Sequence, residues 1–95
     1  MNKYKNRPGV VLAEICGEYL LVSTKEARET CPYVIQINET SSFLWKSLGE
    51  WMDLHGLMKC VTDEYEVDNP DQAMKAVESF VSQMEEMGYL QKASD

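Results

Sequence analysis

Few side chains in this sequence could act as nucleophiles, bases or metal ligands. His55 is its only histidine, and its cysteines are Cys16, Cys31 and Cys60. A nucleophilic Ser, Cys or Thr needs a base beside it, and a structural zinc site needs about four clustered ligands. The cysteines are widely spaced and form no CxxC pair. We therefore expect structural roles for His55 and for three reduced cysteines, at least one of them buried, and no metal or cofactor.

Carboxylates are the other groups that could do chemistry. Adjacent pairs occur at Asp63-Glu64 and at Glu85-Glu86. Such pairs can serve as general acid and base, but both fall on the polar sides of predicted helices, where a solvated face is the usual explanation. No glycine-rich phosphate-binding run is present. The sequence therefore predicts a protein that is not an enzyme.

The length and hydropathy of the chain limit the elements that could position these groups. A chain of 95 residues suits one domain with a modest core. We expect a single domain over 1–95, with loose ends at 1–8 and 91–95. No apolar run approaches the roughly 20 residues of a membrane span, and no signal-like segment follows the polar start. These features favour a cytoplasmic protein without a membrane partner.

The first half of the chain predicts three strands. Residues 10–15 and 18–23 are rich in β-branched and large apolar side chains, and the link Cys16-Gly17 between them suits a two-residue hairpin turn. Residues 33–38 predict a third strand, whose alternate side chains face opposite sides of the sheet.

The second half of the chain predicts three helices. Asn38 or Thr40 can cap the first, Asp53 the second and Asn69 the third, because their side-chain oxygens accept hydrogen bonds from free amides of the first turn. Gly49 and Gly88 are expected near the ends of the first and third helices. Each predicted helix has one apolar face. The first carries Leu44, Trp45, Leu48, Trp51 and Met52, and the second carries Leu54, Leu57, Met58, Val61 and Tyr65. The third carries Ala73, Ala76, Val77, Phe80, Val81, Met84 and Met87. We expect Trp45, Met58, Met84 and Met87 in the core, and Tyr89 and Leu90 folded back onto it.

This order of elements predicts an α+β domain with a small winged-helix-like plan: three antiparallel N-terminal strands followed by three helices. A winged-helix DNA-binding regulator is therefore an alternative function. The net charge of −7 opposes it. A recognition helix should also offer Arg, Lys, Asn or Gln to the DNA groove. Four carboxylates on the outer face of the third predicted helix would repel phosphate. That face offers Asp71, Lys75, Glu78, Ser79, Ser82, Gln83, Glu85 and Glu86.

Several segments, read with that order of elements, match a known family pattern. They are residues 7–12, 34–40, 43–45 and 65–67, then Val77, Phe80-Val81, Met84 and Gly88-Tyr89-Leu90. The most specific part is a strand followed by Asn38, Thr40 and Trp45. Across roughly residues 7–92 the chain resembles the PqqD family, which includes the pyrroloquinoline quinone synthesis protein D and the recognition elements for precursors of ribosomally made, modified peptides. Ser41 stands where the family commonly has glycine.

The resemblance implies a non-catalytic adaptor. Such an adaptor binds the leader segment of a precursor peptide as an added strand beside the third strand, against the third helix. It presents that leader to a separate modifying enzyme, often a radical SAM protein. A third possibility, a subunit that only stabilises a partner enzyme, remains open.

The physical reading of the third strand agrees with strand addition. A small sheet has two edges with unpaired amides and carbonyls, and the third strand is a plausible free edge unless the chain or a second copy covers it. We expect the peptide to contact the backbone of Val34, Ile35, Gln36, Ile37 and Asn38. Helical spacing leaves two flanks of the third helix as the other wall: Met74, Val77 and Val81, or Ala76, Phe80 and Gln83. We choose the first flank, with Glu78 beside it, because its apolar margin extends further toward solvent.

Overall fold

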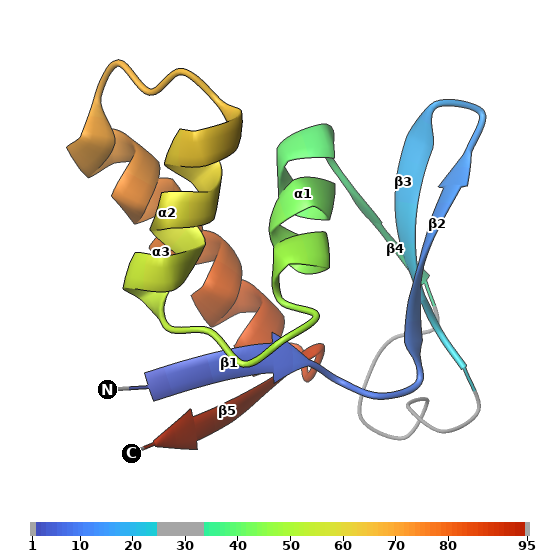
Figure 1. Cartoon of the computed structure of the whole chain (residues 1–95). Coiled ribbons are helices and arrows are strands. Elements are labelled where there is room, and N and C mark those ends of the chain that lie inside the picture. Colours follow the sequence, from blue (N-terminus) through green and yellow to red (C-terminus); the bar gives the residue numbers. More distant parts are fainter. Residues whose placement is uncertain (1, 25–33, 95) are drawn as a thin grey trace.

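The computed structural model describes residues 2–24 and 34–94 (Figure 1). Its strands are β1 (Asn2–Asn6), β2 (Val10–Ile15), β3 (Glu18–Ser23), β4 (Val34–Ile37) and β5 (Leu90–Ser94). Its helices are α1 (Glu39–Ser47), α2 (Leu54–Glu64) and α3 (Pro70–Glu86). Strands β2, β3 and β4 form an antiparallel sheet in that order, and the three helices follow it in the chain. The predicted order of three antiparallel strands followed by three helices is thus confirmed. Cys31 and Tyr33, for which the sequence also makes predictions, lie outside the described residues.

The β2–β3 hairpin forms where the sequence predicts it. Cys16 and Gly17 both have positive φ, 52° and 79°, as a two-residue turn with the right twist requires. In the sheet, Leu12 pairs with Leu21 and Leu21 with Ile35, so all three lie in one row across the strands. Leu21 is fully buried and the other two pack against the core. This row identifies the sheet face that turns toward the helices.

Each helix begins at a residue whose side chain caps it. Asn38 Oδ1 accepts a hydrogen bond from the Ser41 amide at 2.7 Å, and Asp53 Oδ1 accepts one from the Gly56 amide at 2.7 Å. Asn69 Oδ1 accepts one from the Gln72 amide at 3.1 Å. These bonds satisfy amides that have no partner within the helix. The first cap is Asn38, which therefore joins the end of β4 directly to the start of α1.

The end of α3 turns the chain back under the helices. Gly88 has φ 90°, and the amide of Tyr89 donates to the carbonyl of Met84 at 2.9 Å. This pattern closes a helix with a left-handed residue after its last turn, which glycine adopts without strain. Tyr89 and Leu90 are buried, as the sequence predicts.

The two ends of the described chain differ from the loose ends expected at 1–8 and 91–95. Strands β1 and β5 pair as an antiparallel ribbon, from Asn2 opposite Ser94 to Asn6 opposite Leu90 (Figure 1). Tyr4 also exchanges two backbone hydrogen bonds with Met52, at 2.8 and 3.0 Å. Local sequence offers little sign of this ribbon, because most of its residues are polar and only Tyr4 and Leu90 are buried. Pairing between distant segments orders both ends.

Candidate functional site

Strand β4 is an edge of the three-stranded sheet. It pairs on one side with β3, from Val22 opposite Val34 to Tyr19 opposite Ile37. Within residues 2–24 and 34–94, no strand pairs with its other side. Val34 and Gln36 are exposed, whereas Ile35 and Ile37 pack against the core. The predicted alternation of this strand is thus confirmed for the described residues 34–37, and its second edge offers backbone groups to a ligand.

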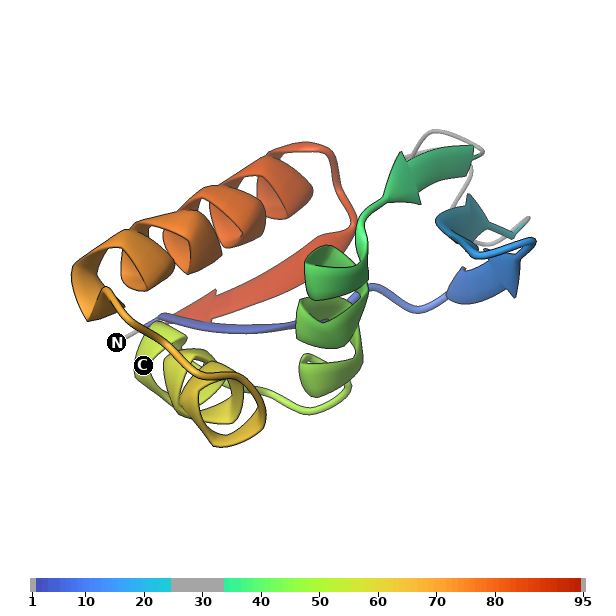
Figure 2. The same cartoon turned by 90° about the horizontal axis from the view of Figure 1, so that it is seen from above.

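A groove begins beside this edge, between β4 and the carboxyl-terminal half of α3. Its first hollow measures about 280 Å³. It is lined by Ile35, Gln36, Ile37, Asn38, Ser41, Phe80, Gln83, Met84 and Met87. In Figure 2 the carboxyl end of α3 approaches β4, while the amino end of α3 lies far from it. The wall opposite β4 therefore combines apolar side chains with the amide of Gln83.

Two further hollows continue the groove along α3. The middle one, of about 270 Å³, shares Asn38, Ser41 and Phe80 with the first. It adds Thr40, Leu44, Val61, Ala73, Ala76 and Val77. The last one, of about 350 Å³, shares Ala73 and Ala76 with the middle one and reaches the turn between α2 and α3. Because neighbouring hollows share lining residues, the three adjoin in a row along α3, and we call this row the β4–α3 groove.

The middle of the groove is the most apolar part. The small side chains of Ala73 and Ala76 leave space there, and Val77 and Phe80 form its base. The last hollow is more polar, because Glu66, Asp68, Asn69 and Gln72 surround it. A bound chain would thus meet backbone groups at β4, an apolar hollow at the start of α1, and polar groups at the far end.

The structure divides the residues that sequence reasoning chose on the third helix. Val77 lines the middle of the groove, together with Asn38. Met74, Glu78 and Val81 do not lie beside β4; they line hollows on another flank of α3. The flank that faces β4 is the other candidate, the one with Ala76, Phe80 and Gln83. Both flanks have apolar margins, so helical periodicity could not show which of them faces β4. The direction in which α3 crosses the sheet determines this.

Ser41, Met84 and Met87 line the groove although sequence reasoning did not include them. Met84 is buried and Met87 half-buried, so their expected place in the core agrees with the structure as well. A signal existed in the sequence: Met84 and Met87 follow Phe80 by four and seven residues, which places them on its flank. Ser41 takes part because Asn38, which ends β4, also caps α1.

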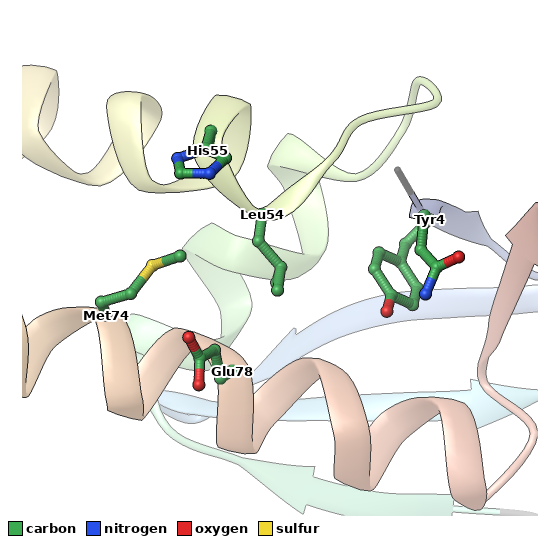
Figure 3. Close-up of a pocket in the computed structure, with 6 residues that line it drawn as sticks. Tyr4, Leu54, His55, Met74 and Glu78 are labelled. Carbon is green, nitrogen blue, oxygen red and sulfur yellow. The ribbon is translucent and has the colours of Figure 1, made fainter. Parts of the chain in front are cut away.

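The hollows on the other flank of α3 lie between α2, β1 and β5. One of about 430 Å³ is lined by Asn2, Tyr4, Leu54, His55, Met74 and Glu78 (Figure 3). A neighbouring one of about 260 Å³ shares Tyr4, Leu54 and Glu78, and adds Val81, Ser82, Glu85 and Lys92. His55 is exposed at the start of α2. We call these two spaces together the α2–α3 hollow.

The groups that sequence reasoning examined for chemistry are dispersed. Cys16 is exposed at the hairpin turn and Cys60 is half-buried on α2. The described residues contain no group of three or more His, Cys, Asp or Glu side chains placed to hold a metal ion. No helix in the described ranges is long and apolar enough to cross a membrane.

One side chain near the sheet has a shifted pKa. The carboxylate of Glu14, assisted by burial and by Glu39, raises the pKa of Tyr19 above its ordinary value. Tyr19 therefore stays a neutral hydroxyl beyond the pH at which a free tyrosine ionises.

Most of the chain matches the model of a known protein family. The family model described as coenzyme PQQ synthesis protein D (PqqD) matches residues 18–90. A search of the curated proteins finds no match.

Two solved structures have a similar fold. One is described as TbiB1 in complex with the TbiA(beta) leader peptide: TM-score 0.70 and 18% identity over 96% of this chain and 99% of that one. The other is lasso peptide synthetase B1 complexed with the leader peptide: TM-score 0.69 and 19% identity over 93% of this chain and 96% of that one. At these identities the likeness concerns the fold. The family match spans β3 through the start of β5 and so includes β4, α1 and α3, and on this ground the chain belongs to the PqqD family.

Proposed function

We propose that this chain is a non-catalytic adaptor that binds the leader segment of a precursor peptide and presents it to a separate modifying enzyme. The observation that carries the proposal is the open edge of β4 beside adjoining hollows along α3. The leader adds a strand to β4, and its inward side chains enter the groove. The outward side chains and the remainder of the precursor stay accessible to the enzyme.

The two walls of the groove have different roles in this binding. Backbone amides and carbonyls along the open edge of β4 supply hydrogen bonds that are indifferent to peptide sequence. Selectivity comes from the side-chain hollows, of which the one over Val77 and Phe80 suits a large apolar residue. The added strand has a period of two, so alternate leader residues should be apolar.

The comparisons support this function without carrying it. Both solved structures of similar fold hold a leader peptide, and the family match covers the elements that build the groove. The alternative of a DNA-binding regulator finds less support. Its recognition helix would be α3, whose exposed side chains include Asp71, Glu78 and Glu86. Three carboxylates on that helix oppose contact with phosphates.

Strand addition can be tested by amide exchange. The probes are peptides selected from a random display library, together with the short precursor encoded beside this chain, where one is found. Saturating peptide should slow exchange along β4, because its free edge becomes hydrogen-bonded. If those amides exchange at an unchanged rate while the peptide is bound, strand addition is wrong even though binding is real.

The assignment of the α3 flank has a matched pair of variants. Gln83→Glu places a charge at the groove wall, and Ser82→Glu places the same charge one residue away, on the flank of the α2–α3 hollow. Both positions are exposed, so both variants should fold. Gln83→Glu should weaken peptide binding at least about tenfold, roughly 1.4 kcal/mol, since the peptide desolvates the new charge. Titration calorimetry should show little change for Ser82→Glu, and equal losses in both variants would contradict the assignment.

A further inference from the structure

The α2–α3 hollow has a chemistry of its own. Leu54 and Met74 supply aliphatic surface, and Tyr4 lies at the opposite side with its hydroxyl at the ring's outer end (Figure 3). Glu78 projects from α3 beside Met74, on the side of Leu54 away from Tyr4. The hollow therefore has apolar walls with a carboxylate among them.

Charge is distributed unevenly around this hollow. Glu78 and Glu85 lie seven residues apart on the same row of α3, and the lining has one cation, Lys92. In the described part of the chain, no hydrogen bond or ion pair involving the carboxylate of Glu78 is found. A carboxylate beside aliphatic walls matches a side chain with a long apolar stem and a cationic end.

The length of the hollow indicates a polypeptide occupant. Its two parts adjoin through Tyr4, Leu54 and Glu78, and measure about 430 and 260 Å³. Together they extend from Met74 to Glu85, which is about three turns of α3 and more than one side chain fills. A second copy of this chain is a poor fit as the occupant, because the net charge of −7 makes two copies repel.

We propose that the α2–α3 hollow binds an Arg or Lys side chain of a partner polypeptide, flanked by apolar residues. The aliphatic stem packs on Leu54 and Met74, and the cationic end pairs with Glu78. None of the residues that line this hollow lines the part of the groove beside β4. The site is therefore separate from the proposed leader-binding groove, and the chain can hold two polypeptides at once, as an adaptor that joins a substrate to an enzyme requires.

The test uses two peptides that differ in one charge. The probes are the N-acetylated, amidated tripeptide Leu-Arg-Leu and the same tripeptide with citrulline, which is neutral and nearly isosteric, in place of arginine. Each is titrated into the isotopically labelled full chain and followed by NMR. The arginine peptide should shift the amides of Tyr4, Leu54, Met74 and Glu78, and should bind at least about threefold more tightly than the citrulline peptide, the scale of a partly exposed charge pair.

Two variants of the same helix serve as test and control. Glu78→Gln removes the carboxylate in the hollow, whereas Glu86→Gln removes an exposed carboxylate that lines neither the hollow nor the groove. Glu78→Gln should abolish the preference for arginine, and Glu86→Gln should retain it. Equal binding of the two peptides would overturn the proposal. So would equal effects of the two variants, which would mean general attraction to an acidic chain.

The two proposals fail separately. A peptide that occupies the β4–α3 groove should not displace the arginine tripeptide. If the groove peptide displaces the tripeptide, or if the tripeptide shifts mainly the amides of residues 34–38, both peptides share one site. That result would overturn the proposal for the α2–α3 hollow and leave leader binding intact. If the amides of β4 exchange equally fast with and without a bound leader, strand addition is wrong. That result would not affect the proposal for the α2–α3 hollow.

Discussion

Trp45 shows how one residue connects the site to the core. It lies on α1, about two turns after Asn38, the cap that follows β4, and is 4% exposed. Its ring meets the ring of Tyr89 edge-on, with centroids 6.5 Å apart. The carbonyl of Trp45 also accepts a hydrogen bond from Asn6 Nδ2 at 2.9 Å. This residue therefore holds α1, the end of α3 and β1 together.

Trp45→Ala should destabilise the fold by about 3–5 kcal/mol, because it leaves a large cavity where the surroundings relax only in part. Urea denaturation followed by circular dichroism measures the loss. The chain supplies a control in Trp51→Ala, since Trp51 is 44% exposed and its truncation should cost much less. Similar losses in the two variants would contradict the role given to Trp45.

Val81 illustrates why burial must be known before a binding test is chosen. Sequence periodicity places it at the margin of the apolar face of α3, yet it is 2% exposed. A charge there would be buried without a partner and would unfold the protein rather than weaken a ligand. Gln83, exposed at the groove wall, is the position where a charge reports on binding alone.

At the scale of elements, the β1–β5 ribbon packs against the helices and helps to fix the position of α3. It contributes Tyr4 and Leu90 to the core, and its first strand bonds to Met52 ahead of α2. The amide of Arg7 donates to the carbonyl of Tyr89 at 2.9 Å, which links the end of β1 to the turn after α3. The ribbon thereby sets the position of the helix that forms one wall of the groove.

Tyr4→Ala should therefore lower stability by about 3 kcal/mol or more, on the scale of large aromatic truncations in a core. Thermal unfolding of the two variants Tyr4→Ala and Val11→Ala provides the comparison. Val11 is 52% exposed in a strand of the other sheet, and its change should stay within about 0.5 kcal/mol. An unchanged midpoint for Tyr4→Ala would mean that the ribbon adds nothing to the fold.

The whole molecule combines a strong negative charge with two separate concave surfaces along one helix. Its net charge of −7 favours solubility and repels polyanions. The lining residues place the β4–α3 groove and the α2–α3 hollow on different flanks of α3. This arrangement suits a protein that brings two polypeptides together.

Mixed-sequence duplex DNA should not bind this chain at physiological ionic strength. Binding without base recognition depends on Lys and Arg contacts to phosphates, and the net charge here has the opposite sign. Fluorescence anisotropy of a labelled duplex, titrated with the protein at low and at physiological salt, measures this. Association that falls steeply as salt rises would restore the DNA-binding alternative.

Sequence by itself determined the local features of this protein. The caps Asp53 and Asn69 and the hairpin turn at Cys16-Gly17 lie where their side-chain and backbone preferences predict, and the first cap is Asn38, one of the two residues that the sequence allows. The alternation in β4 follows from neighbours in the chain as well. The order of three strands and three helices, and with it the resemblance to the PqqD family, could therefore be read before any coordinates.

Only the tertiary structure decided which surfaces face each other. The flank of α3 beside β4 depends on the crossing of a helix over a sheet, and two flanks with similar apolar margins have the same periodicity. The β1–β5 ribbon depends on a partner about 90 residues away, and its polar residues carry no hydrophobic pattern. Local preferences act within a few residues, whereas the groove and the hollow are built by contacts between segments far apart in the sequence.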